Sequence, residues 1–259
     1  MPLWDMLDLQ RIDGDLFEAR WADMRRERLF GGQVAAQSLR AAGLTVDGGR
    51  PVHSLHCYFI RPGRTSEPLR FDVRRTRDGR TFSTRHVTAS QEGKPIFEAI
   101  ASFHDPEPGV EWQPDPPAGM PPADGLAPLE TPWLPPEVDI RPVRPPGDFP
   151  IGHPFWVRVP EPPGADAAVH ACALTYLSDY GAVNAARPPD DATRYGMRLS
   201  LDHTLWFHRP PRVGGWLLYT MGPAGNGGGR GLAHGAFHTP DGTLVASVAQ
   251  EALLRLPRD

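Results

Sequence analysis

The order of apolar and polar positions predicts one helix and a set of strands in the first part of this chain. Apolar or small residues recur with the period of a helix over 34–44. Four segments with strand character follow at 52–61, 69–76, 81–90 and 96–104, and turn residues separate them. A helix followed by about four antiparallel strands is an α+β unit, in which we expect the sheet to wrap the helix.

The same order of elements returns in the second part of the chain. The pattern predicts a helix over 167–183 that is longer and more apolar than the first, so we expect it to be central and mostly buried. The expected strands of this part lie at 155–159, 200–209, 216–221, 230–239 and 243–254.

Two similar segments indicate that one unit is duplicated. VHSLHCYFIRP (52–62) and SLDHTLWFHRP (200–210) align with an offset of 148 residues, which places Leu55 on His203. A second pair of similar segments follows them in the same order. Matched blocks in the same order are the signature of an internal repeat.

The repeat divides the chain into an N-terminal unit (1–105), a proline-rich connection (106–150) and a C-terminal unit (151–259). Residues 106–163 hold 19 of the 31 prolines, too many for regular secondary structure. We expect the connection to lie over the surface of the two units.

Composition narrows the class of protein. With 259 residues, 40% of them hydrophobic and 22% charged, the chain is of the soluble globular kind. A net charge of -4 argues against nucleic acid as a partner. The chain has neither a run of 18 apolar residues nor the plan of a signal peptide, which predicts a cytoplasmic protein with no membrane partner. Cys57 and Cys172 lie in apolar segments and are expected to be buried thiols.

Polar residues at apolar positions of the second unit are candidates for a site. Gln250 is the polar exception on one face of the last strand, and its counterpart in the first unit is Ala101. Asp179 shares the helical stripe of Cys172 and Tyr176, where burial would raise its pKa towards that of a general base. A structural hydrogen bond for Gln250 and a solvent-exposed helix end for Asp179 remain open alternatives.

Other motifs carry less information. Gly31 and Gly32 predict a turn before the first helix, with N–H groups suited to a carbonyl oxygen, although a tight entry turn explains them equally well. The GNGGGRG segment at Gly225 predicts a mobile hairpin loop and matches no nucleotide-binding motif. Ser200 has no nucleophile elbow around it.

The histidines do not have the spacing of metal ligands. His53 and His56, like His203 and His208, fall on opposite faces of a strand. The pair of histidines on the strand 230–239 has no third ligand in view. We expect structural or surface roles for these side chains and no metal.

In order along the chain, LFGGQVAAQSLRAA, VHSLHCYFIRPG, RTRDGRTFSTRHV, LSDYG, SLDHTLWFHRP and DGTLVASVAQE resemble the type II acyl-CoA thioesterases, the TesB-like family. The likeness covers nearly the whole chain outside the proline-rich connection. It implies a double hot-dog fold, with two tandem repeats that each wrap a long helix in an antiparallel sheet. It also implies that Asp179, Ser200 and Gln250 hold a water for attack on a thioester, with Ser200 where family members often carry Thr.

The resemblance therefore implies hydrolysis of acyl-CoA to free fatty acid and CoA by general-base catalysis, without a metal or redox cofactor. Hot-dog sheets usually pair edge to edge, so a homodimer or larger homo-oligomer is expected. One alternative is a non-catalytic acyl-CoA-binding or regulatory protein on the same fold. Another is a hydratase, for which Asp148 and His153 have the Asp-x4-His spacing but lie in the proline-rich region.

Overall fold

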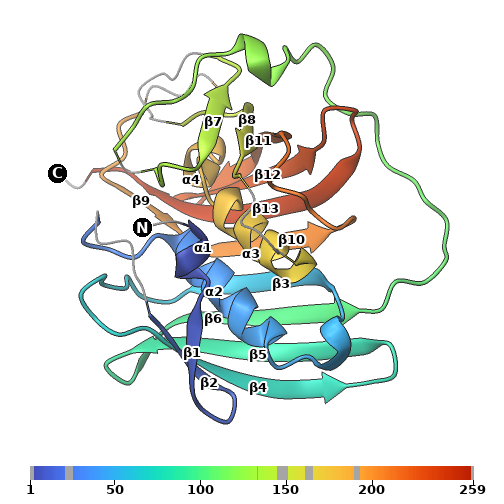
Figure 1. Cartoon of the computed structure of the whole chain (residues 1–259). Coiled ribbons are helices and arrows are strands. Elements are labelled where there is room, and N and C mark those ends of the chain that lie inside the picture. The colour runs from blue at the N-terminus through green and yellow to red at the C-terminus, as the bar shows by residue number, and fades with distance from the viewer. Residues whose placement is uncertain are drawn as a thin grey trace.

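One antiparallel sheet of 13 strands dominates the computed structural model, which describes residues 3–20, 26–132, 134–144, 151–160, 166–189 and 193–257 (Figure 1). The strands are β1 (Leu9–Asp13), β2 (Leu16–Ala19), β3 (Val52–Phe59), β4 (Arg70–Asp78), β5 (Phe82–Gln91), β6 (Lys94–His104), β7 (Asp139–Pro142), β8 (Phe155–Arg158), β9 (Met197–Ser200), β10 (Asp202–Phe207), β11 (Leu217–Gly227), β12 (Arg230–His238) and β13 (Leu244–Arg255). The helices are α1 (Leu3–Met6), α2 (Gly31–Gly43), α3 (Ala167–Ser178) and α4 (Ala182–Ala185), with 3-10 turns at Asp47–Gly49 and Ala123–Gly125.

The two parts of the chain meet in the middle of this sheet. The strand order is β1-β2-β4-β5-β6-β3-β10-β13-β12-β11-β8-β7, and β9 also pairs with β13. The strands β3 and β10, which carry the repeated segment, pair with each other and place Leu55 opposite Leu205 and Cys57 opposite His203. Moving either pair by the repeat offset of 148 gives the other pair, so the junction has the register of a two-fold relation between the repeats.

The two longer helices, α2 and α3, lie side by side against the inner face of the sheet (Figure 1). Small side chains on α2, among them Ala35 and Ala36, are fully buried, which lets the helices approach closely. The α3 helix is buried on every side from His170 to Ser178, in agreement with its nearly uniform apolar sequence. Apolar residues from both parts of the chain join in one core.

The helices are shorter than the resemblance implied. In the described part of the chain only α2 and α3 exceed seven residues, with 13 and 12 residues. The expected helix over 167–183 ends at Ser178, because Asp179 caps it and Gly181 then takes a positive φ of 75° that no continuing helix allows. A separate short helix, α4, follows.

Three further expectations are corrected by the backbone. The segment 200–209 is broken at Leu201 into β9 and β10, which pair with different stretches of β13. The glycine-rich segment is mostly strand, because β11 extends to Gly227 and the turn is confined to Gly228 and Gly229, both with positive φ. The Gly31-Gly32 pair forms the first turn of α2 instead of preceding it.

The described part of the proline-rich connection forms one short strand, β7, which pairs with β8 at the end of the sheet. Of the Asp148 and His153 pair, Asp148 lies outside the described residues.

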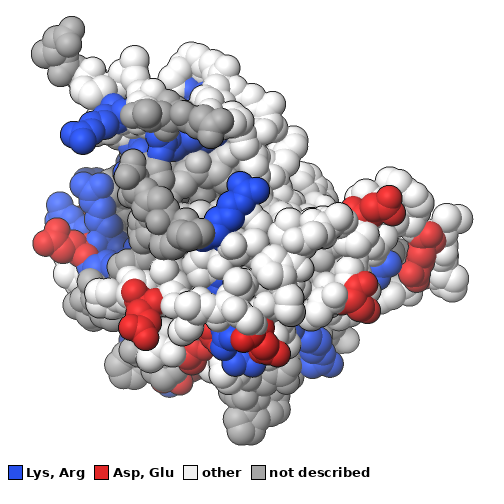
Figure 2. Space-filling view, turned by 90° about the horizontal axis from the view of Figure 1, so that it is seen from above, with Lys and Arg blue, Asp and Glu red and all other residues white. Residues whose placement is uncertain are grey.

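Charged side chains of both signs are scattered over the largely uncharged face in Figure 2, and several basic side chains gather at its left side. No helix within the described ranges combines the length and apolar character needed to cross a bilayer.

Candidate active site

Three separate elements bring Asp179, Ser200 and Gln250 to one place. Asp179 follows the last residue of α3, Ser200 is the last residue of β9, and Gln250 lies within β13. The pairing of β9 with β13 sets Ser200 opposite Ala252, whose side chain shares a strand face with that of Gln250. The Gln250 Nε2 group donates a hydrogen bond to Ser200 Oγ at 2.9 Å.

The Asp179 carboxyl is buried, with 8% of the residue exposed, so of the two alternatives the solvent-exposed helix end is wrong. Burial raises its pKa from the usual 3.8 to about 7, and contacts with the Gly32 N–H, Gln250, Arg26 and Ser200 offset only part of this effect. Its Oδ2 atom accepts a hydrogen bond of 2.9 Å from the Gly32 N–H. Its Oδ1 atom has no hydrogen-bond partner among the described residues. A carboxyl with these properties can exchange a proton near neutral pH.

The two glycines are required by the close approach of α2 to α3. A Cβ atom on Gly31 would lie 2.8 Å from Asp179 Oδ2 and 2.7 Å from the Phe59 ring. A Cβ atom on Gly32 would lie 2.5 Å from the Tyr176 carbonyl oxygen. The first turn of α2 therefore directs bare backbone at the Asp179 carboxylate, where the positive end of the helix dipole also favours negative charge.

One N–H group of this turn remains available. The Gly32 N–H is used by Asp179, whereas the Gly31 N–H meets no acceptor within the described ranges. Gly31 also lines both cavities beside the site.

His203 is a buried neighbour of Gln250 to which the sequence analysis gave only a structural or surface role. It lies on β10 with 0% exposure, and its Nδ1 atom is 2.5 Å from Gln250 Oε1. The signal was present in the sequence, because the repeat alignment places this histidine on apolar Leu55.

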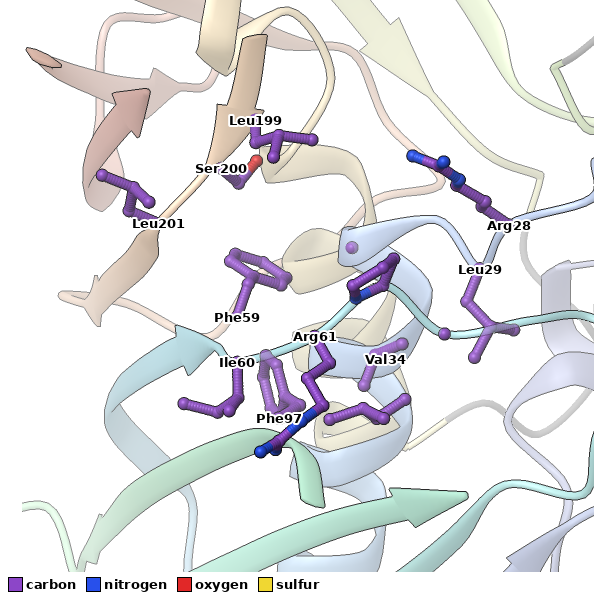
Figure 3. A pocket seen from close by; sticks show the side chains of 14 residues that line it. Arg28, Leu29, Val34, Phe59, Ile60, Arg61, Phe97, Leu199, Ser200 and Leu201 are labelled. Atoms are coloured by element: carbon purple, nitrogen blue, oxygen red, sulfur yellow. The ribbon is translucent and has the colours of Figure 1, made fainter. Parts of the chain in front are cut away.

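An apolar cavity of about 350 Å³ opens beside Ser200. Figure 3 shows the rings of Phe59 and Phe97 and the side chain of Val34 around it, with Ser200 at the side of the Phe59 ring away from Phe97. Such a lining suits an alkyl or other apolar group.

A second, more polar cavity of about 440 Å³ adjoins the first and contains Asp179. The sequence analysis did not single out the three arginines that line it, Arg26, Arg28 and Arg198. The sequence gives little indication of this cluster, because the chain has many arginines and only the fold brings residues 26–28 close to residue 198. Guanidinium groups in this arrangement suit a phosphate-bearing ligand.

The described residues contain no group of three or more His, Cys, Asp or Glu side chains that could hold a metal ion. Cys57 and Cys172 are free and buried. The Asp179 carboxyl, the Ser200 hydroxyl and the Gln250 amide can transfer protons and form hydrogen bonds with a bound ligand.

Two family models match most of the chain. Residues 18–104 match the model described as the N-terminal domain of acyl-CoA thioesterases, and residues 106–254 match that of the C-terminal domain. The chain is 36% identical to human acyl-coenzyme A thioesterase 8, covering 97% of this chain and 88% of the relative. It is 33% identical to acyl-CoA thioesterase 2 of Haemophilus influenzae, covering 96% of both chains.

Solved structures give the same result. The acyl-CoA thioesterase II TesB2 of Mycobacterium marinum superposes with a TM-score of 0.83 at 39% identity, over 98% of this chain and 96% of that one. A protein from Alicyclobacillus acidocaldarius described as having a hot dog fold superposes with a TM-score of 0.77 at 21% identity, over 98% of both chains, which supports the fold alone. On the family models, the relatives and the fold together, this chain belongs to the acyl-CoA thioesterase family of the TesB-like type.

Proposed function

We propose that this chain hydrolyses an acyl-CoA with a water molecule activated by Asp179 and oriented by Ser200 and Gln250. The observation that carries the assignment is a buried carboxyl, with a pKa of about 7, beside a hydrogen-bonded Ser200 and Gln250 pair. A general base works best when its pKa lies near the working pH. Ser200 supplies the hydroxyl that the family often takes from Thr.

In this mechanism Asp179 takes a proton from the water as the water oxygen attacks the thioester carbonyl carbon. The carbon–sulfur bond then breaks, and the proton held by Asp179 passes to the sulfur. The products are the carboxylic acid and the free thiol of CoA. No covalent intermediate with the protein is needed, in keeping with the absence of a nucleophile elbow at Ser200.

The Gly31 N–H is our candidate for stabilising the negative charge that develops on the carbonyl oxygen. It lies at the positive end of α2, lines both cavities and meets no acceptor in the described part of the chain. Gly32 is assigned a different role, because its N–H already binds Asp179.

The two cavities suggest how the substrate lies. The apolar cavity next to Ser200 would take the acyl group, and the arginine-lined cavity that contains Asp179 would take the phosphate-bearing part of CoA. This places the thioester between them, at the end where Gly31 and Ser200 line both.

The same proposal covers the organisation of the molecule. We infer a double hot-dog, with units at 1–105 and 151–259, each built around one helix, and a connection at 106–150 between them. The register of β3 and β10 supports the two-fold relation of these units. A cytoplasmic homo-oligomer remains our expectation for this enzyme.

The experiment that tests the function measures thiol release from acyl-CoAs of short, long, branched and aromatic acyl groups, for the parent and for Asp179→Asn. We expect turnover by the parent and a loss of about 10²- to 10⁴-fold in kcat for the variant, because the base is removed while the shape is kept. Turnover by Asp179→Asn at the parent rate would show that the base is misassigned. Binding without turnover by the parent would identify a non-catalytic acyl-CoA binder.

A further inference from the structure

His203 links the candidate site to the central helix. Its Nδ1 atom lies 2.5 Å from Gln250 Oε1, and its Nε2 atom lies 2.7 Å from Oγ of Ser178, the last residue of α3. On the far side of Gln250, the amide Nε2 donates to Ser200 Oγ at 2.9 Å. A continuous chain of hydrogen bonds therefore runs from α3 through β10 and β13 to Ser200.

One assignment of protons satisfies the polar groups of this chain of hydrogen bonds. With the Gln250 carbonyl oxygen facing the ring, His203 carries its proton on Nδ1, because an amide oxygen can only accept. Burial lowers the pKa of His203 to about 4, which leaves the ring neutral and its Nε2 atom an acceptor. The Ser178 hydroxyl is within reach of both the Thr175 carbonyl and His203 Nε2, and in this assignment its single proton goes to the histidine.

In this arrangement His203 holds the Gln250 amide in one of its two orientations. With Oε1 held by the imidazole N–H, the amide NH₂ group is the end that faces Ser200. A reversed amide would place its NH₂ group against Nδ1 and would require His203 to carry its proton on Nε2 instead.

The first repeat shows that the fold does not require this polar pair. At the equivalent positions Leu55 and Ala101 pair across β3 and β6, and both are fully buried. Two apolar side chains thus fill in the first unit the place that His203 and Gln250 fill in the second. The polar pair, His203 and Gln250, is therefore found in the unit that also carries Asp179.

We propose that His203 is a positioning residue, which holds the Gln250 amide with its NH₂ group towards Ser200 while Ser178 holds the ring against α3. The proposal rests on the roles given above to Asp179, Ser200 and Gln250. His203 itself stays neutral and moves no proton in the reaction.

The first test replaces His203 with the residue of the other repeat, His203→Leu. We expect kcat to fall about 10- to 100-fold, because a small misplacement of an orienting group can cost up to this much. We expect KM to stay within about twofold, since His203 lines neither cavity. The matched control is His238→Leu, which removes another buried imidazole, at the end of β12, and should keep the parent kcat.

A second pair of variants separates positioning from folding. His203→Asn can place an amide N–H near the Nδ1 position and should retain most of kcat. His203→Gln reaches instead towards Ser178 and should lose kcat as His203→Leu does. Thermal unfolding of all variants measures their stability independently of kcat. If His203→Asn and His203→Gln are destabilised to the same extent and lose kcat equally, the proposal is overturned.

The decisive measurement combines His203→Leu with Gln250→Ala. Because His203 acts through Gln250, the double variant should lose no more kcat than Gln250→Ala alone. If the fold-losses in kcat of the two single variants multiply in the double variant, the proposal for His203 is overturned. It is also overturned if His203→Leu keeps the kcat of the parent while Gln250→Ala lowers it. A parent kcat in Gln250→Ala would instead overturn the role of Gln250, and the role of His203 with it.

Discussion

Asp179 combines two properties that usually exclude each other, deep burial and an ionisable carboxyl. The helix end and the Gly32 N–H favour its ionised form less than burial disfavours it, so its pKa rises to about 7. The residue is therefore placed to accept a proton at neutral pH, and it costs the protein stability when it is charged. Both consequences can be measured.

The first consequence concerns activity. We expect kcat/KM to rise with pH through a midpoint near 7, because only the ionised Asp179 can accept a proton from water. Initial rates of thioester loss between pH 5 and pH 9 check this expectation. A profile that is flat across this range would show that another group is the base.

The second consequence concerns stability. The unfolded chain releases the Asp179 proton near pH 3.8 and the folded chain releases it near pH 7, so the unfolded state binds fewer protons between these values. The free energy of unfolding then falls as pH rises from about 4 to 7, by up to about 4 kcal/mol, and levels off above.

Asp179→Asn removes the titrating group, and with it the fall in the free energy of unfolding, and keeps a side-chain oxygen for the Gly32 N–H. We expect the variant to be more stable than the parent by a margin that grows from pH 4 to pH 7, as measured by chemical denaturation. A margin that does not change with pH would mean that Asp179 is not the titrating group.

At the scale of elements, the site depends on the contact between the start of α2 and the end of α3. Gly32 lies against the Tyr176 carbonyl, and its N–H reaches Asp179. The position of Asp179, the proposed base, thus depends on how closely the two helices approach, and this close approach requires glycine at position 32.

Gly32→Ala should therefore damage both stability and turnover. Its Cβ atom would meet backbone at 2.5 Å, so the helices must separate, at a cost of about 1 to 3 kcal/mol. Gly43→Ala is the matched control on the same helix, because its nearest contact is Phe103 at 3.9 Å. We expect Gly43→Ala to be neutral or stabilising by up to about 1 kcal/mol. Melting temperatures and kcat of both variants test this contrast, and equal effects would contradict it.

At the scale of the whole molecule, the two repeats share one sheet and one core. The sheet is continuous through β3 and β10, and buried side chains of both units belong to the same apolar cluster. Neither unit can lose its structure without exposing the inner surface of the other.

We expect thermal unfolding to be a single cooperative transition for this reason, with the calorimetric enthalpy equal to the van't Hoff enthalpy. Far-ultraviolet and near-ultraviolet circular dichroism should give the same midpoint. Two separated transitions would show that the units are stabilised independently, contrary to the shared core.

Much of the architecture follows from local patterns in the sequence. Helical and strand periods located α2 and most strands to within a few residues, and the repeat placed β3 and β10 in equivalent roles. The apolar pattern continues past Ser178 and therefore predicts a longer helix than α3, whereas the backbone turns at Gly181. The glycines at 225–227 look like a loop in the sequence but are held in a strand by pairing with β12.

Local patterns in the sequence predicted two units, the polar exceptions at Asp179 and Gln250, and the family resemblance, because periodicity and residue type are local properties. The contact of Gly32 with Asp179 across 147 residues, and that of His203 with Gln250, emerge from the folded chain. Those contacts depend on strand register and on the distance between two helices. Packing of the whole chain fixes these quantities, and no local segment encodes them.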